Sequence, residues 1–60
     1  MNLHKQIMEI VVRERIVTTS DVSNELKISW NTADSYLKEL LIEKKVERIK
    51  KKGVTLWIKK

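Results

Sequence analysis

The chain has 60 residues, 42% of them hydrophobic and 35% charged, with 13 basic and 8 acidic side chains that give a net charge of +5. This length predicts a single domain, residues 1–60, with a small core. The sequence has no cysteine and one histidine, which excludes disulfides and leaves no ligand set for a metal. No apolar run approaches the ~20 residues that span a bilayer, and the N-terminus does not resemble a signal peptide, so we expect a cytoplasmic protein without a cofactor.

Residues 3–15 have the spacing of an amphipathic helix, and Asn2 is a suitable N-cap. The positions that predict its buried stripe are Leu3, Ile7, Ile10 and Val11. Met8 and Val12 lie well round the helix from Leu3, so we expect both side chains near solvent. An exposed apolar pair one turn apart can seed a contact between helices, and self-association stabilises a short chain. The sequence therefore predicts a homodimer that uses Met8 and Val12.

Residues 16–17 form a short extended run, and a second helix is predicted for residues 19–27. Thr18 and Asp21 have the spacing of a capping box at its start. The alternative caps are Thr19 and Ser20, and the predicted buried positions are Val22 and Leu26.

The third and longest predicted helix covers residues 30–44, with Ser29 as its N-cap. One face of this helix is apolar and comprises Ala33, Leu37, Leu40 and Leu41. The opposite face carries short polar groups and one aromatic side chain, namely Trp30, Asn31, Asp34, Ser35 and Lys38. This helix thus presents a polar surface at its N-terminal end.

The apolar period then changes toward two, which predicts strands at residues 46–50 and 54–58. The turn between them, residues 51–53, contains Gly53, the only glycine in the chain, which tolerates a positive φ. Trp57 has apolar neighbours on both sides, and we interpret it as closing the core under the sheet. The last segment is therefore an antiparallel hairpin with lysines at its tip.

The segments Thr18–Ser23, Leu26–Ser29 and Asn31–Ala33, followed by Tyr36–Leu37 and Leu40, resemble the helix-turn-helix of the winged-helix superfamily. The tail Lys45–Ile49, with Gly53, Thr55 and Trp57, resembles its wing, and the compact regulators of archaea and bacteria are most similar. This resemblance implies an α+β, mainly α, fold of three helices and a C-terminal β-hairpin wing. Lys27 departs from it, since many relatives carry glycine in that turn, and a left-handed lysine costs roughly 1 kcal/mol.

In the resembled superfamily the third helix enters the major groove, which here implies base contacts from helix 30–44. Its candidate DNA-binding residues are Trp30, Asn31, Thr32, Ser35 and Lys38, with Tyr36 as a further candidate. Asn31 has the amide that pairs with adenine, and Thr32 and Ser35 can bond phosphate or base. Other interpretations stay open: Thr32 supports the first turn, Tyr36 packs in the core, and Trp30 either meets a thymine methyl or covers Ile28.

The predicted wing, residues 46–58, supplies the second set of candidate DNA contacts. Residues 44–60 carry eight basic side chains and one acidic side chain, a local charge of +7. The candidate phosphate contacts are Arg48, Lys50, Lys51 and Lys52, with Lys59 and Lys60 beside the same hairpin. The alternative interpretation is a charge run that protects an edge strand from aggregation. Helix 30–44 also carries Asp34, Glu39 and Glu43, which would repel phosphates unless they point away.

These features favour double-stranded DNA binding by a transcriptional regulator. The alternative is a winged helix that contacts protein, such as an appended domain of a replication or transcription machine, which the acidic groups of helix 30–44 favour. A basic tail without a basic amphipathic helix gives membrane binding little support. We expect no enzyme and no small-molecule ligand, because no carboxylate pair lies beside a histidine or a glycine-rich loop.

Overall fold

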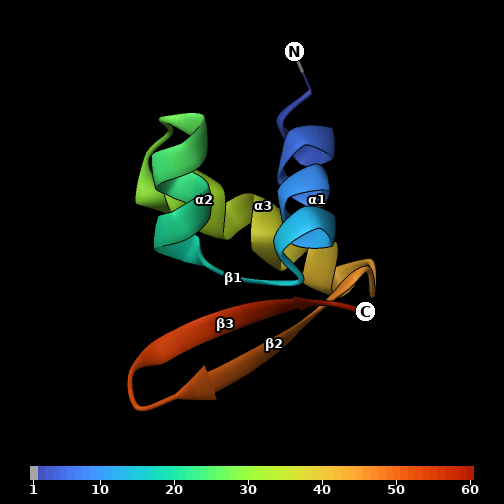
Figure 1. Cartoon of the computed structure of the whole chain (residues 1–60), viewed down its shortest axis with the longest axis vertical. Helices are drawn as coiled ribbons and strands as arrows, with labels where there is room; N and C mark the ends of the chain where they lie inside the picture. Colours follow the sequence, from blue (N-terminus) through green and yellow to red (C-terminus); the bar gives the residue numbers. More distant parts are fainter. Residues whose placement is uncertain (1) are drawn as a thin grey trace.

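The computed structural model describes residues 2–60. The elements in chain order are α1 (Leu3–Glu14), β1 (Ile16–Thr18), α2 (Thr19–Leu26), α3 (Trp30–Ile42), β2 (Val46–Lys51) and β3 (Val54–Lys59). The three helices lie on one side of a small antiparallel sheet, and the β2–β3 hairpin extends beyond them (Figure 1). The predicted α+β fold of three helices and a C-terminal hairpin is confirmed.

The helix starts follow the predicted caps. The Asn2 side chain accepts a hydrogen bond from the Lys5 N–H at 3.2 Å. The Thr18 hydroxyl accepts from the Asp21 N–H at 3.0 Å, and the Asp21 carboxylate accepts from the Thr18 N–H at 3.1 Å. Thr18 is therefore the cap of α2, in place of the alternatives Thr19 and Ser20.

Each helix ends earlier than predicted, because a residue with positive φ stops it. Arg15 (φ 71°) ends α1 at Glu14 instead of 15, and Lys27 (φ 55°, ψ 44°) ends α2 at Leu26 instead of 27. Helix α3 ends at Ile42 instead of 44, since Lys44 has φ 64°. Around that lysine, the Lys44 N–H donates to the Leu41 carbonyl and the Lys45 N–H donates to the Leu40 carbonyl, the pattern of a Schellman cap.

The sheet has the order β1-β3-β2, with both neighbouring pairs antiparallel. Ile16–Thr18 pairs with the second half of β3, which confirms the short extended run as a strand. The hairpin strands are each one residue longer than predicted. Lys51 pairs with Val54, which extends β2 and shortens the turn to two residues, and Lys59 pairs with Val46, which extends β3. Lys52 (φ 47°) and Gly53 (φ 80°) both have the positive φ that a type I′ turn requires.

The core lies between the helices and the inner face of the sheet. Its fully buried side chains are Ile7, Ile10, Val11, Val17, Val22, Ala33, Leu37, Leu40, Val46 and Trp57, which confirms the core position of Trp57. Leu3, Leu26 and Leu41, predicted to be buried, are half-buried. Leu3 and Leu26 are the first and last residues of their helices, where neighbouring turns are missing on one side.

The two α1 residues assigned to a homodimer have different environments. Val12 is 42% exposed, as predicted. Met8, which we expected near solvent, is half-buried and packs against the core, because its long side chain reaches back over the helix surface. On the same helix, the Arg13 guanidinium lies 2.6 Å from the carboxylate of Glu25 in α2. Hydrogen bonds to Glu25, and to a smaller extent to Glu14, raise the pKa of Arg13.

Between residues 2 and 60, no helix is both long and apolar enough to cross a membrane. Over the same range, no group of three or more His, Asp or Glu side chains is arranged to hold a metal ion.

Candidate nucleic-acid interface

Helix α3 starts with a compact hydrogen-bonded turn. The Ser29 hydroxyl accepts from the Thr32 N–H at 3.1 Å and donates to the Thr32 hydroxyl at 2.8 Å. This arrangement satisfies one of the free N–H groups at the helix start. Thr32 is therefore part of the N-cap of α3, which is one of the roles that the sequence left open for it. Its hydroxyl oxygen already accepts a hydrogen bond from Ser29.

Two neighbouring strips of side chains run along the first half of α3. Asn31 and Ser35, four residues apart, form an exposed polar strip opposite the buried face. Trp30, Asp34 and Lys38 form a second strip at the same spacing, and this strip lines a hollow toward the wing. Trp30 is 51% exposed and also borders the β3 end of the turn at Gly53. The structure thus brings Trp30, Asp34 and Lys38 beside the hairpin, with the exposed Asn31–Ser35 strip next to them on the same helix.

The acidic side chains of α3 differ in where they point. The Asp34 carboxylate lies 2.9 Å from the Lys38 ammonium, one helical turn along, with only 16% of its side chain exposed. Glu39 lies toward α1, where its carboxylate is 3.8 Å from the His4 ring. Lys38 is therefore partly neutralised, and Glu39 points away from the Asn31–Ser35 strip.

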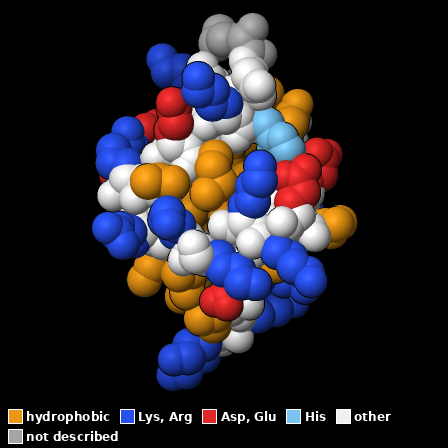
Figure 2. All heavy atoms as spheres, turned by 90° about the vertical axis from the view of Figure 1, so that its right-hand side faces the viewer, with side chains coloured by type: hydrophobic (Ala, Val, Ile, Leu, Met, Phe, Trp, Pro, Cys, Tyr) orange, Lys and Arg blue, Asp and Glu red, His pale blue; other side chains and the backbone are white. Residues whose placement is uncertain are grey.

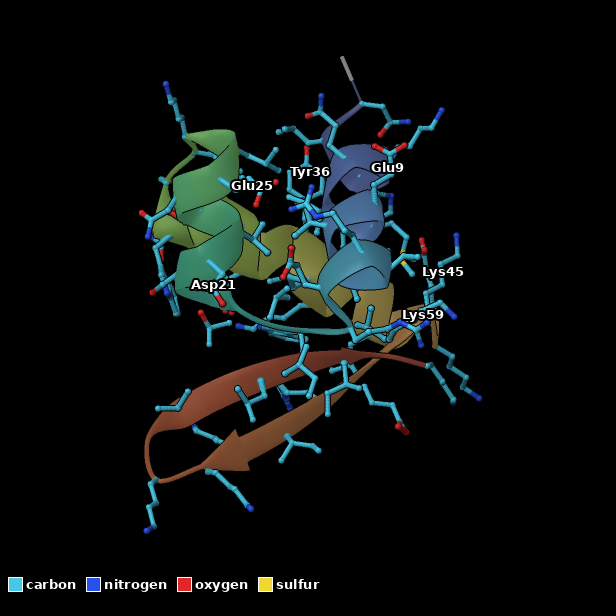
Figure 3. The ribbon with its side chains drawn as sticks, viewed as in Figure 1. Glu9, Asp21, Glu25, Tyr36, Lys45 and Lys59 are labelled. Carbon is cyan, nitrogen blue, oxygen red and sulfur yellow. The ribbon has the colours of Figure 1, made fainter. Side chains whose placement is uncertain are left out.

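Tyr36 belongs to the α1 side of α3 and not to the exposed strip. Its ring centroid is 5.7 Å from that of His4, and its side chain packs against the core. In Figure 3 Tyr36 points toward α1, away from the hairpin. The packing interpretation of Tyr36 is confirmed.

The wing is fixed to α2 through one buried contact. The Trp57 indole N–H donates to the Thr19 hydroxyl at 2.9 Å, and both residues are almost fully buried. Above the same indole, the Arg48 guanidinium lies 5.9 Å from the ring centroid, a cation–π contact. Sequence reasoning missed Thr19, whose only signal was a hydroxyl at the first position of a helix.

The basic tail divides into two clusters at opposite ends of the hairpin. The tip cluster, Arg48, Lys50, Lys51 and Lys52, lies at the β2 end that faces the start of α3. The base cluster consists of Lys44, Lys45, Lys59 and Lys60, and the Lys60 N–H donates to the Lys45 carbonyl at 3.3 Å. Figure 3 places Lys45 and Lys59 together near the C-terminus, and Figure 2 looks onto this end, where Lys and Arg side chains crowd the lower half. Of the tip cluster, Arg48 and Lys50 line the hollow that Trp30, Asp34 and Lys38 of α3 also line.

Three helices with a short turn between α2 and α3, followed by a hairpin, define a small domain of the helix-turn-helix type. The family model described as FaeA-like protein matches residues 3–60, and the chain belongs to this family. No curated protein matches the chain.

Proposed function

We propose that this protein is a transcriptional regulator that binds double-stranded DNA through α3 and the tip cluster of the wing. The observation that carries the proposal is the shared surface. Side chains of the first half of α3 and the cations Arg48 and Lys50 line the same hollow. A duplex that receives α3 in its major groove brings its phosphates over the hairpin. The FaeA-like family is one of winged-helix-like regulators, which supports the same function.

In this proposal the two parts of the surface do different work. Asn31 and Ser35 are exposed and offer amide and hydroxyl groups to base edges. Trp30 offers an apolar edge for a thymine methyl or a sugar. Lys38 is engaged by Asp34 at 2.9 Å, so most of the attraction for phosphates comes from the wing. We propose no catalytic step.

A salt series on duplex DNA tests the proposal. Binding through phosphates gives a steep negative slope of log affinity against log salt concentration. The combined Lys50, Lys51 and Lys52→Ala variant should weaken binding to every duplex and flatten the slope by up to about three contacts. A matched variant with Lys44, Lys45 and Lys60→Ala removes the same charge from the base cluster and should retain most of the slope. Equal slopes for both variants would contradict a binding role for the tip.

The second candidate function is protein contact, which is favoured by the acidic groups Asp34 and Glu39 of α3 and Glu43 directly after it. A chain that serves this function binds duplex DNA weakly and with the same small salt slope in all variants. The salt series therefore separates the two functions.

A homodimer remains part of the proposal, because two copies double the DNA surface and stabilise a short chain. The α1 pair predicted from the sequence, Met8 and Val12, borders a shallow apolar hollow with Lys5, Glu9 and Arg13. Met8 is half-buried, which leaves Val12 as the main exposed apolar group there. Sedimentation equilibrium of Met8→Glu and Val12→Glu measures whether this surface holds two copies together.

A further inference from the structure

The outer face of the sheet is rich in apolar side chains and is turned away from the three helices, which lie on the other side of the sheet (Figure 1). Side chains alternate between the two faces of a strand, and directly paired residues share a face. Because Trp57 and Val46 are buried on the inner face, the register assigns to the outer face Ile16, Thr18, Glu47, Ile49, Lys51, Val54, Leu56 and Ile58. Ile16 is 53% exposed and Ile49 is 42% exposed.

The charges on this face have a self-complementary order. Along β2 the outer side chains are Glu47, Ile49 and Lys51, so an acid and a base stand at equal distances on either side of an isoleucine. The neighbouring positions on β3 are Ile58, Leu56 and Val54. A patch with an apolar centre and opposite charges at its two ends is complementary to a copy of itself turned end to end.

We propose that a second copy of this chain docks on the outer face of the sheet. A two-fold axis that lies between the two sheets and crosses the strands at Ile49 stacks β2 on the partner's β2 in the opposite direction. Glu47 then faces the partner's Lys51, and Ile49 and Leu56 meet the same residues of the partner. Face-to-face packing of this kind buries the apolar side chains between sheets about 10 Å apart. The face is small for a specific interface, so association is weak and depends on concentration.

Pairing of the exposed β2 edges would be the other way for two copies to meet through this strand. An antiparallel edge pairing centred on Ile49 places Arg48 directly opposite the partner's Lys50. Like charges directly opposite across two strands are destabilising. The same edge pairing also places Glu47 opposite the partner's Lys51, so its favourable and unfavourable charge pairs offset one another. Stacking of the outer faces keeps the favourable Glu47–Lys51 pairs without the unfavourable ones and also buries Ile49 and Leu56.

The α1 surface and the outer face are alternatives for a closed dimer. If the α1 surface and the outer face each paired with the same surface of another copy, the copies would assemble into an open row and not into a closed dimer. The outer face presents a continuous apolar strip across two strands, whereas the α1 surface has Val12 and the half-buried Met8. The dimer is therefore assigned to the sheet.

This arrangement has a consequence for DNA, which rests on the proposed function. Of the tip cluster, Arg48 and Lys50 belong to the inner face, on the side of α3, whereas Lys51 belongs to the docking face. The DNA surface that stays free in the dimer is therefore α3 with Arg48 and Lys50, on the side opposite the docking face. Two copies joined by their outer faces direct their α3 helices away from one another. The dimer consequently joins two separate duplex segments, in contrast to a dimer that places both helices one turn apart on a single duplex.

Sedimentation equilibrium without DNA, over a concentration series into the high micromolar range, tests the docking. The wild-type chain should reach dimer mass, and Glu47→Lys or Lys51→Glu should each weaken association roughly tenfold or more, since each places like charges together at both ends. The combined Glu47→Lys/Lys51→Glu variant restores opposite charges and should regain dimerisation. A double variant as weak as the single ones would overturn the proposed orientation, and a monomer throughout would overturn the docking.

Apolar-to-acid variants locate the surface. Ile49→Glu and Leu56→Glu should both remain monomeric with helical circular dichroism retained. Ile42→Glu is the matched control, because Ile42 is 78% exposed at the end of α3 and should leave the dimer intact. A dimer that survives Leu56→Glu but not Ile49→Glu would indicate edge pairing and overturn the proposal, as would a dimer lost in Val12→Glu alone.

Capture of a labelled duplex by a second, immobilised duplex tests the consequence for DNA. The wild-type chain should bridge the two. Ile49→Glu adds an acid between Arg48 and Lys50 and should bind a single duplex less tightly, but at concentrations that saturate a single duplex it should bridge none. Bridging by Ile49→Glu would overturn this role. Failure of every variant to bind a single duplex would instead reject the DNA-binding function, while the sedimentation result would still decide the docking.

Discussion

The two faces of the sheet differ in composition although they belong to the same three strands. The inner face carries Trp57, whose indole is hydrogen-bonded to Thr19, together with the cations Arg48 and Lys50. The outer face carries Ile49, Leu56 and an acid and a base at its two ends. Since successive side chains alternate between faces, one short hairpin holds the core and the proposed DNA contacts on one face and an apolar surface on the other.

Among substitutions on the two faces, the largest expected loss of stability is at Trp57. Trp57→Ala removes the largest core side chain and leaves the Thr19 hydroxyl buried without its donor, which should cost roughly 3–5 kcal/mol. A domain of this size has little more than that to lose, so we expect the variant to be largely unfolded by circular dichroism.

Trp30→Ala is the matched control for that substitution. Trp30 is 51% exposed, and surface substitutions usually change stability by less than about 0.5 kcal/mol. If both variants melted at the same temperature, the anchoring of the wing through Trp57 would be wrong.

Asn31 tests the proposed base contacts of α3, the helix on the inner-face side of the sheet. Asn31→Ala should cost roughly 1–3 kcal/mol of binding on a specific site and little on random DNA, because an amide to a base edge carries sequence information. The measurement is a titration of both duplexes at one salt concentration. Equal losses on the two would make Asn31 a phosphate contact, and no loss on either would favour protein contact.

Single lysine variants compare the two faces directly. Lys50→Ala removes an inner-face cation beside α3 and should reduce the salt slope of duplex binding by about one contact. Lys51→Ala removes an outer-face cation and should mainly weaken self-association, with a smaller change in slope. Identical slopes for the two would show that the faces contribute alike to binding.

The smallest expected effect concerns the turn that joins the two strands. Lys52 has φ 47°, a conformation that asparagine adopts more readily than lysine. Lys52→Asn should raise the free energy of unfolding by up to about 1 kcal/mol while it removes one cation from the tip. The melting temperature should therefore rise while the affinity for duplex DNA falls. A variant with a lower melting temperature would contradict the turn geometry.

Local signals in the sequence determined the order of the elements and the residue at which each one starts, whereas each element ends at a residue other than the predicted one. The Thr18–Asp21 capping box, the Ser29 cap and the Gly53 turn act between residues a few positions apart, so they could be predicted before any packing was known. Exposure of Asn31 and Ser35 followed from helical spacing alone.

The tertiary structure decided which of these elements meet. The Thr19–Trp57 hydrogen bond joins residues 38 positions apart, and the division of the basic tail into tip and base clusters depends on the pairing of Val46 with Lys59 and of Lys51 with Val54. Strand register is set by packing against the helices, and a shift of one residue would exchange the two faces of the sheet. For that reason the composition of the hairpin was visible in the sequence, whereas the separation of its inner-face cations from its apolar outer face required the fold.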